Sequence, residues 1–182
     1  MAESGVSLSD LDIESLMRAY DSLGTFPDVP RALASLASDP HIDAYVFSNG
    51  TEAMVSASVN KSPSLSPHAS VFKGLVTVDE VQVFKPDLKG YQHLATRVGK
   101  SALPGDMATL WLVSGNPFDV VGARSAGMQA AWVDRAGGHH GSGGWNDKLG
   151  ELASGGPTII VKGVDEAVDA IRKWNADYGA NE

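Results

Sequence analysis

Short apolar runs alternate with amphipathic stretches along most of the chain. Continuous apolar runs of about four to eight residues are typical of buried parallel strands. They predict strands at 44–47, 74–78, 81–84, 110–113, 130–133 and 158–161. Between these runs apolar residues recur at helical spacing, which predicts helices that begin near Ser9 or Asp10, Pro30, Thr51, Leu88, Val120 and Val164. Alternating strands and helices favour an α/β fold with a parallel sheet and right-handed crossovers.

The composition limits the classes of partner. With 182 residues and 43% hydrophobic content, the chain is expected to form one main core. A net charge of -8 and a pI near 5.0 argue against nucleic acid or an anionic membrane as partners. The sequence has no Cys, which excludes disulfides and thiolate chemistry. No apolar stretch reaches the roughly 18 residues of a membrane span, and the acidic start is unlike a signal peptide, so we expect a cytoplasmic protein.

Polar residues follow three of the predicted strands, at the position where open α/β sheets place their chemistry. The three segments are Ser48-Asn49-Gly50, Lys85-Pro86-Asp87 and Ser114-Gly115-Asn116-Pro117-Phe118-Asp119. Taken singly, each has a simpler interpretation, because Ser-Asn-Gly is typical of a helix cap and Lys-Pro-Asp of a solvated turn. Together they would bring a hydroxyl, an amine and a carboxylate to one edge of the sheet.

In this order the three segments resemble motifs two, three and four of the haloacid dehalogenase superfamily, and most closely its 2-haloacid dehalogenase branch. That branch has a Ser-Ser-Asn-x-aromatic-Asp pattern, from which this chain departs only at Gly115. Phosphatases of the superfamily instead place two carboxylates there to hold magnesium. Here only Asp119 remains, and a hard divalent cation would be poorly held, so neither a metal nor a cofactor is expected.

The resemblance implies a covalent mechanism, in which a carboxylate displaces halide from the α-carbon and water then hydrolyses the resulting ester with inversion. It implies catalytic roles for one set of residues, namely Lys85, Ser114, Asn116 and Asp119. Lys85 would balance the nucleophile, and Asp119 with Asn116 would position water. It also implies a substrate-binding set, namely Ser48, Asn49, Tyr91 and Phe118, although a Tyr on a helix face is more often a core residue.

The attacking carboxylate that the resemblance requires should end an apolar strand in the middle of the sheet, before x-Tyr-Gly-Thr. The segment Asp21-Ser22-Leu23-Gly24-Thr25 has matching letters, but residues 14–20 before it are charged and helically spaced. We do not interpret Asp21 as the nucleophile. The resemblance then implies a Rossmann-like core that is incomplete because its central first strand is missing. Residues 1–26 would be a remnant of the cap region or a linker helix, 27–176 the core and 177–182 a tail.

Two functions remain open. One is a haloacid dehalogenase-like hydrolase that is inactive as a truncated chain and whose family acts on small 2-haloacids. The other is a non-catalytic module that binds a small anion, or a second copy or partner chain through an exposed sheet edge. The adjacent His139 and His140 lie in a glycine-rich segment and give too few fixed ligands for a metal site.

Overall fold

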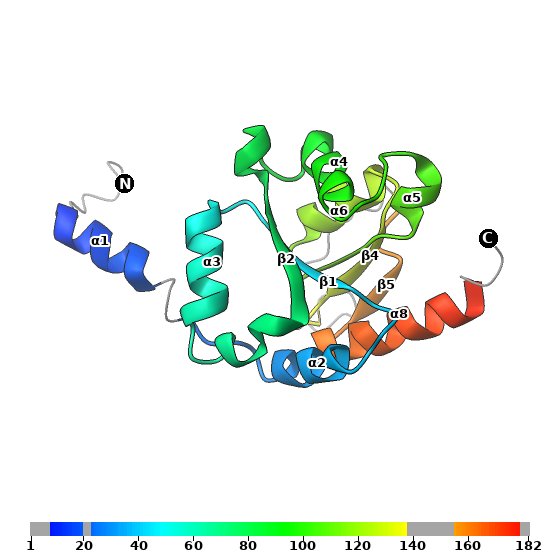
Figure 1. Cartoon of the computed structure of the whole chain (residues 1–182), viewed down its shortest axis with the longest axis horizontal. Helices are drawn as coiled ribbons and strands as arrows, with labels where there is room; N and C mark the ends of the chain where they lie inside the picture. Colours follow the sequence, from blue (N-terminus) through cyan, green and yellow to red (C-terminus); the bar gives the residue numbers. More distant parts are fainter. Residues whose placement is uncertain (1–7, 20–22, 138–154, 179–182) are drawn as a thin grey trace.

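The computed structural model describes residues 8–19, 23–137 and 155–178, which form an α/β core with parallel strands. Helices cover both faces of the strands, with α4 and α6 on one side and α2 and α8 on the other (Figure 1). The helices are α1 (Asp10–Ala19), α2 (Asp28–Ala37), α3 (Glu52–Lys61), α4 (Leu88–Arg97), α5 (Pro104–Ala108), α6 (Pro117–Ser125) and α8 (Val164–Tyr178), with 3-10 helices η3 (Ser66–Val71) and η4 (Val78–Val81). The strands are β1 (Ala44–Ser48), β2 (Phe72–Thr77), β3 (Trp111–Ser114), β4 (Gln129–Val133) and β5 (Ile159–Val161).

The described strands form two separate sheets. β1 and β2 make a two-stranded sheet in which Ser48 lies opposite Thr77, and β3, β4 and β5 make a three-stranded sheet in which Ser114 lies opposite Trp132. Every pair is parallel. Within the described part of the chain, no pairing joins β1 to β3, so each of these two strands has one edge without a strand neighbour. The expected incomplete Rossmann-like core is therefore confirmed.

The main core lies between the strands and the α4, α5 and α6 side. Apolar residues on α4 recur at helical spacing and place Tyr91, Leu94 and Ala95 in this core. They pack against Leu112 of β3 and against Val120 and Ala123 of α6, among others. This packing fixes the positions of α4 and α6. α4 begins directly after the segment 85–87, and α6 begins at Pro117, within the segment 114–119.

Two predicted features of the strands are wrong. Residues 81–84 form no strand, because η4 ends at Val81 and Gln82 then takes a left-handed backbone with φ of 52°. Val113 was expected to be buried on both faces of the sheet, but its exposed fraction is 36%. It lies on β3, which has no neighbour on the side towards β1, and this open side accounts for the exposure.

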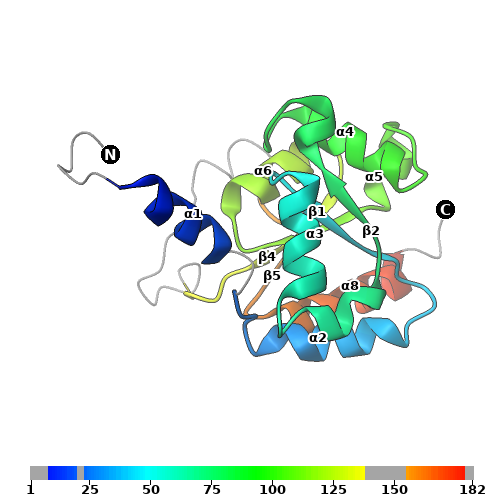
Figure 2. The same ribbon diagram turned by 60° about the vertical axis from the view of Figure 1, so that its left-hand side comes forward.

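Helix α1 lies apart from the α/β core in both views (Figures 1 and 2). Its apolar residues Leu11, Ile13 and Leu16 are exposed, although their helical spacing correctly predicted the helix. The domain division after residue 26 stays a prediction. None of the helices in the described ranges is both long and apolar enough to cross a membrane.

Candidate active site

The three predicted segments meet at the carboxyl ends of β1 and β3. Ser48 ends β1 and Ser114 ends β3, while Lys85 lies in the turn that precedes α4. The parallel direction of the strands brings Ser48 and Ser114 to the same edge of the molecule. Asp119, in the first turn of α6, comes to this edge because α6 begins directly after the loop that follows β3.

Lys85 connects the two sheets at this edge. Its ammonium group donates hydrogen bonds to the carbonyl oxygen of Phe47, at 3.2 Å, and to Oδ2 of Asp119, at 3.3 Å. The ammonium nitrogen also lies 4.7 Å from the centre of the Phe47 ring. The side chains of Lys85 and Asp119 are only 8% and 6% exposed, so the pair is almost fully removed from water. In such surroundings each charge depends on the other for compensation.

Ser114 positions the Asp119 carboxylate. Its hydroxyl donates to Asp119 Oδ2 at 3.0 Å and accepts a hydrogen bond from the main-chain amide of Asn116 at 3.0 Å. The second carboxylate oxygen, Asp119 Oδ1, is buried and has no hydrogen-bond partner among the described residues. A buried acceptor without a donor is costly, so this oxygen is suited to a ligand or water that donates a hydrogen bond.

Asn49 fixes the main chain of Lys85, because its side-chain oxygen accepts a hydrogen bond from the Lys85 amide at 2.9 Å. The Ser48 hydroxyl accepts from the amide of Gly50 at 3.0 Å. The first contact ties the β1 end to the turn before α4, the second is local, and neither is a helix cap, since Thr51 caps α3. The predicted role of these two residues in substrate binding stays a prediction.

Tyr91 lies beneath the site and not on its surface. The side chain is fully buried, and its hydroxyl donates to the main-chain carbonyl of Asp119 at 3.0 Å. Burial, together with the nearby Asp119 carboxylate, raises the pKa of Tyr91 above its usual range. Contact with a substrate, which the resemblance implied, is not favoured by this placement. Tyr91 instead supports the helix that presents Asp119.

Asn116 and Phe118 lie at the exposed rim of the same edge. Asn116 precedes α6 and uses its main-chain carbonyl to accept the amide of Asp119 at 3.1 Å, while its side chain makes no cap hydrogen bond. The Phe118 side chain is 48% exposed, as is fitting for a wall at a site mouth. Phe84, directly before Lys85, is also exposed, so an apolar ring precedes each of the two buried charges.

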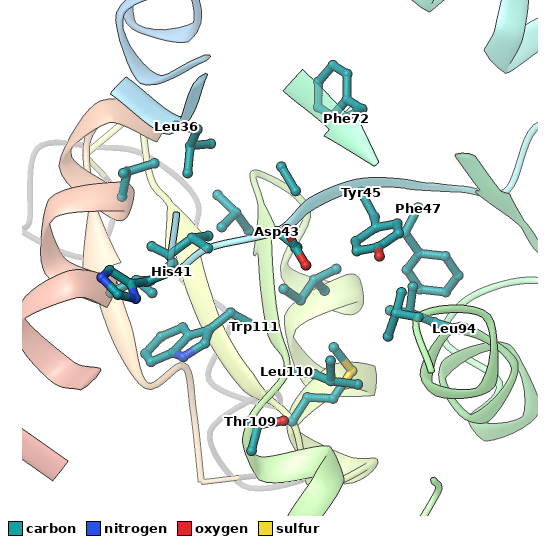
Figure 3. A pocket seen from close by; sticks show the side chains of 18 of the residues that line it. Leu36, His41, Asp43, Tyr45, Phe47, Phe72, Leu94, Thr109, Leu110 and Trp111 are labelled. Atoms are coloured by element: carbon teal, nitrogen blue, oxygen red, sulfur yellow. The ribbon is translucent and has the colours of Figure 1, made fainter. Parts of the chain in front are cut away.

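A cavity of about 540 Å³ lies between β1 and β3 and reaches Phe47, whose carbonyl oxygen accepts a hydrogen bond from Lys85. Figure 3 shows Leu110 and Trp111 across this cavity from Tyr45 and Phe47. Leu94 of α4 and Ile171 of α8 also line it. We call this cavity the β1–β3 groove. It occupies the position that a further strand between the two sheets would fill.

Two features of the site were missed by sequence reasoning. Phe47 contributes both a carbonyl oxygen and a ring to the Lys85 ammonium, and its only signal was an aromatic residue directly before Ser48. The second is the pairing of Asp28 with Arg135, which ties the start of α2 to the segment after β4. These residues are 107 positions apart, and no local pattern links them.

The described residues contain no group of three or more His, Asp or Glu side chains arranged to hold a metal ion. Asp21, His139 and His140 lie outside the described residues. The site is a buried lysine–carboxylate pair, Lys85 and Asp119, at the carboxyl ends of the strands of an α/β fold.

Curated proteins with similar sequences are dehalogenases. An (S)-2-haloacid dehalogenase of Pseudomonas sp. (strain YL) is 32% identical over 136 residues, which are 73% of this chain and 53% of that protein. Haloacetate dehalogenase H-2 of Moraxella sp. (strain B) is 31% identical over 131 residues, 70% of this chain and 54% of that protein. The chain spans about half the length of the curated relatives it matches. No family model matches the sequence.

Two solved structures with a similar fold are also dehalogenases. A dehalogenase with an intermediate complex has a TM-score of 0.70 and 25% identity, over 90% of this chain and 64% of that one. The L-2-haloacid dehalogenase from Xanthobacter autotrophicus, with chloropropionic acid covalently bound, has a TM-score of 0.72 over 94% of this chain and 70% of that one. At 23% identity the latter shows the fold alone. The chain belongs to the haloacid dehalogenase superfamily, and the curated relatives described above are 2-haloacid and haloacetate dehalogenases.

Proposed function

We propose that this chain forms the lysine side of a haloacid dehalogenase-like hydrolase site that accepts a small 2-haloacid. The observation that carries the proposal is the buried Lys85, held between Phe47 and Asp119 where β1 and β3 end. A desolvated cation at this edge would stabilise negative charge on an attacking carboxylate and on the substrate. The similar curated dehalogenases support the reaction class.

The remaining site residues divide by position. Ser48 and Asn49, at the end of β1, would bind the substrate carboxylate or the leaving halide. Asp119, oriented by Ser114, would use its unpartnered Oδ1 to hold the hydrolytic water, with Asn116 beside it. Phe118 would form an apolar wall at the mouth of the site. In this scheme the water attacks the ester carbonyl, and Asp119 accepts a hydrogen bond from it.

We further propose that the chain does not release halide by itself. Among the described residues, Asp119 is the carboxylate that pairs with Lys85, and its Oδ2 is already bound by Ser114. An attacking carboxylate needs an accessible oxygen aimed at the substrate carbon, and a second carboxylate at Lys85 would be required for this role.

Substrate binding can be tested without turnover. Titration of the labelled protein with 2-chloropropionate should shift the amide NMR signals of 48–50 and 114–116, and uncharged 2-chloropropanamide should not. The double variant Lys85→Met/Asp119→Leu should lose the response, since it removes the cation without leaving an unpaired buried charge. Equal responses to the acid and the amide, or an unchanged response in the double variant, would refute a lysine-centred anion site.

A second candidate function is a protein-interaction module. It is favoured by the open edges of β1 and β3, which face the β1–β3 groove. Backbone groups at an open strand edge can pair with another strand. A second copy of the chain or a different protein could supply that strand.

A further inference from the structure

Asn49 and Gly50 form the only Asn-Gly dipeptide in the sequence. The dipeptide lies between the end of β1 at Ser48 and the start of α3, inside the candidate active site. An Asn side chain in front of Gly is open to attack by its own main chain, because Gly has no Cβ atom to shield the amide nitrogen. The candidate site therefore contains a chemically reactive dipeptide.

The fold favours Gly at position 50. A Cβ atom there would lie 3.3 Å from Ser48 Oγ and 3.3 Å from Val55 Cγ2, which is tighter than most real contacts. Val55 is a buried residue of α3, so its side chain can yield only at the cost of core packing. The corner between β1 and α3 thus retains the Gly that makes Asn49 reactive.

The reaction is a cyclisation followed by hydrolysis. The main-chain nitrogen of Gly50 attacks Cγ of Asn49, an N–Cγ bond forms, the Cγ–Nδ2 bond breaks, and the Gly50 amide proton leaves with Nδ2 as ammonia. Water then opens the cyclic imide at one of its two carbonyl groups. One opening gives an aspartate, and the other gives an isoaspartate, whose main chain runs through the former side chain and is one methylene longer.

Two hydrogen bonds oppose this cyclisation in the folded chain. Asn49 Oδ1 accepts a hydrogen bond from the main-chain amide of Lys85 at 2.9 Å, which holds the side chain towards the turn before α4. The Gly50 amide donates its proton to Ser48 Oγ at 3.0 Å. Ring closure turns the Asn49 side chain back onto its own main chain and removes the Gly50 proton, so both contacts must open first. The rate of the reaction therefore reports how often the Lys85 turn separates from the end of β1.

We propose that Asn49 is a self-modification site, and that its contact with the Lys85 amide and the contact of Gly50 with Ser48 hold the conversion to aspartate or isoaspartate in check. The longer main chain of the isoaspartate form would displace the oxygen that now binds the Lys85 amide. The modified chain would then lose the fixed position of the Lys85 turn. The reaction needs water but no haloacid, so a failed haloacid titration would leave this inference standing, and its own failure would leave the hydrolase proposal standing.

The test is incubation of the full chain in mildly alkaline buffer, followed by peptide mapping with mass spectrometry and an isoaspartate assay. The chain unfolded in urea should modify Asn49 roughly five- to a hundredfold faster than the folded chain, as expected when two hydrogen bonds no longer oppose the reaction. Asn116 is an internal control, because Pro117 has no amide proton and cannot attack in the same way. Equal rates at Asn49 in the folded and unfolded chains, or no modification in either, would overturn the proposal.

A matched pair of variants tests the contact of Gly50 with Ser48. Ser48→Ala removes the acceptor of the Gly50 amide and should raise the rate in the folded chain roughly two- to tenfold. Ser70→Ala, at an exposed position of η3, should leave the rate unchanged. An equal rate in Ser48→Ala and the unaltered chain would contradict the proposed protection.

The consequence for Lys85 has its own readout. The isoaspartate form carries one more negative charge than the unmodified chain and can be isolated by ion exchange. Its Lys85 amide should exchange with solvent faster than in the unmodified chain, because the acceptor at Asn49 is displaced. Unchanged exchange at Lys85 would show that the contact survives the modification and would overturn this part of the proposal.

Discussion

The hydroxyl of Tyr91 donates a hydrogen bond to the main-chain carbonyl oxygen of Asp119 at 3.0 Å. Through this contact a core residue of α4 sets the position of the first turn of α6. The Tyr91 ring also packs edge-on against Phe47, with ring centres 5.6 Å apart. Tyr91 therefore contacts both partners of the Lys85 ammonium, Phe47 and Asp119.

Gly122 is required by this arrangement. A Cβ atom at position 122 would lie 2.6 Å from Tyr91 Cζ, which no real contact allows. Gly122→Ala should therefore destabilise the protein by about 1–3 kcal/mol, although Ala in a helix interior is normally better than Gly by about 1 kcal/mol. Urea unfolding measures the change. The matched control is Gly105→Ala in α5, where nothing lies within 4 Å of the new Cβ and no loss is expected.

If the clash with Tyr91 is the cause, the cost of Gly122→Ala should largely vanish in a Tyr91→Ala background, where the ring is absent. A cost that is the same in both backgrounds would show that Gly122 is needed for another reason.

The contributions of Lys85 and Asp119 to the free energy of unfolding should depend strongly on each other. Lys85→Met leaves the Asp119 carboxylate buried without a cation, which typically costs about 3–5 kcal/mol. Lys85→Met/Asp119→Leu removes both charges and should recover most of that loss. Chemical unfolding of the single and double variants measures the coupling. Additive losses in the double variant would mean that the two side chains do not compensate each other in the folded protein.

Gly115 should tolerate the Ser found at the corresponding position of the dehalogenase pattern. A Cβ atom there would lie 3.6 Å from the Val133 carbonyl oxygen and 3.9 Å from Arg135 Nη1, which are ordinary contact distances. Gly115→Ser should therefore change the free energy of unfolding by no more than about 0.5 kcal/mol. Thermal unfolding checks this, and a large loss would mean that the loop after β3 needs Gly for its backbone.

Asp28 should make the free energy of unfolding depend on pH in the acid range. Burial raises the pKa of Asp28, but hydrogen bonds from Arg135 and from the Val164 amide outweigh it and hold the pKa below its usual value. A lowered folded-state pKa means that the stabilisation is complete above the unfolded value of about 3.9 and is lost as the pH falls through the lower folded value. Asp28→Asn should be less stable than the unaltered chain at pH 7, by about 1–3 kcal/mol.

The difference between the two proteins should shrink as the pH falls below about 4, because Asp28 is then protonated first in the unfolded and at lower pH also in the folded chain, and the advantage of its ionised form is lost. The exposed Asp177→Asn provides the control, with no expected loss at pH 7. A constant difference between pH 7 and pH 3 would show that the ionised form of Asp28 is not what stabilises the fold.

Much of the α/β fold was predictable because apolar runs and helical spacing report burial directly. The strand at 110–113 and the helix from Leu88 follow such patterns and were found within one residue of the predicted bounds. The strand predicted at 81–84 failed for a local reason, since Val81 ends a 3-10 helix and Gln82 takes a left-handed backbone, which interrupts an extended run over these four residues. The exposure of Val113 depends on a missing neighbour, which no local pattern reports.

The site was predictable only in part. The placement of polar residues after strands correctly indicated that Lys85, Ser114 and Asp119 would meet. It could not show that Tyr91 points into the core, because helical spacing alone does not reveal where its hydroxyl finds an acceptor. Nor could it show that the Phe47 carbonyl binds the Lys85 ammonium, since every residue has a carbonyl group and only the fold selects one.

The most direct test of the central claim is the rate of chloride release from 2-chloropropionate by the 182-residue chain. Because Asp119 is the carboxylate found at Lys85 within the described residues, the expected rate equals that of buffer alone. Asp21→Asn, at a position outside the described residues, is measured in parallel. Turnover that the Asp21→Asn variant abolishes would contradict the account and identify Asp21 as the nucleophile of a complete enzyme.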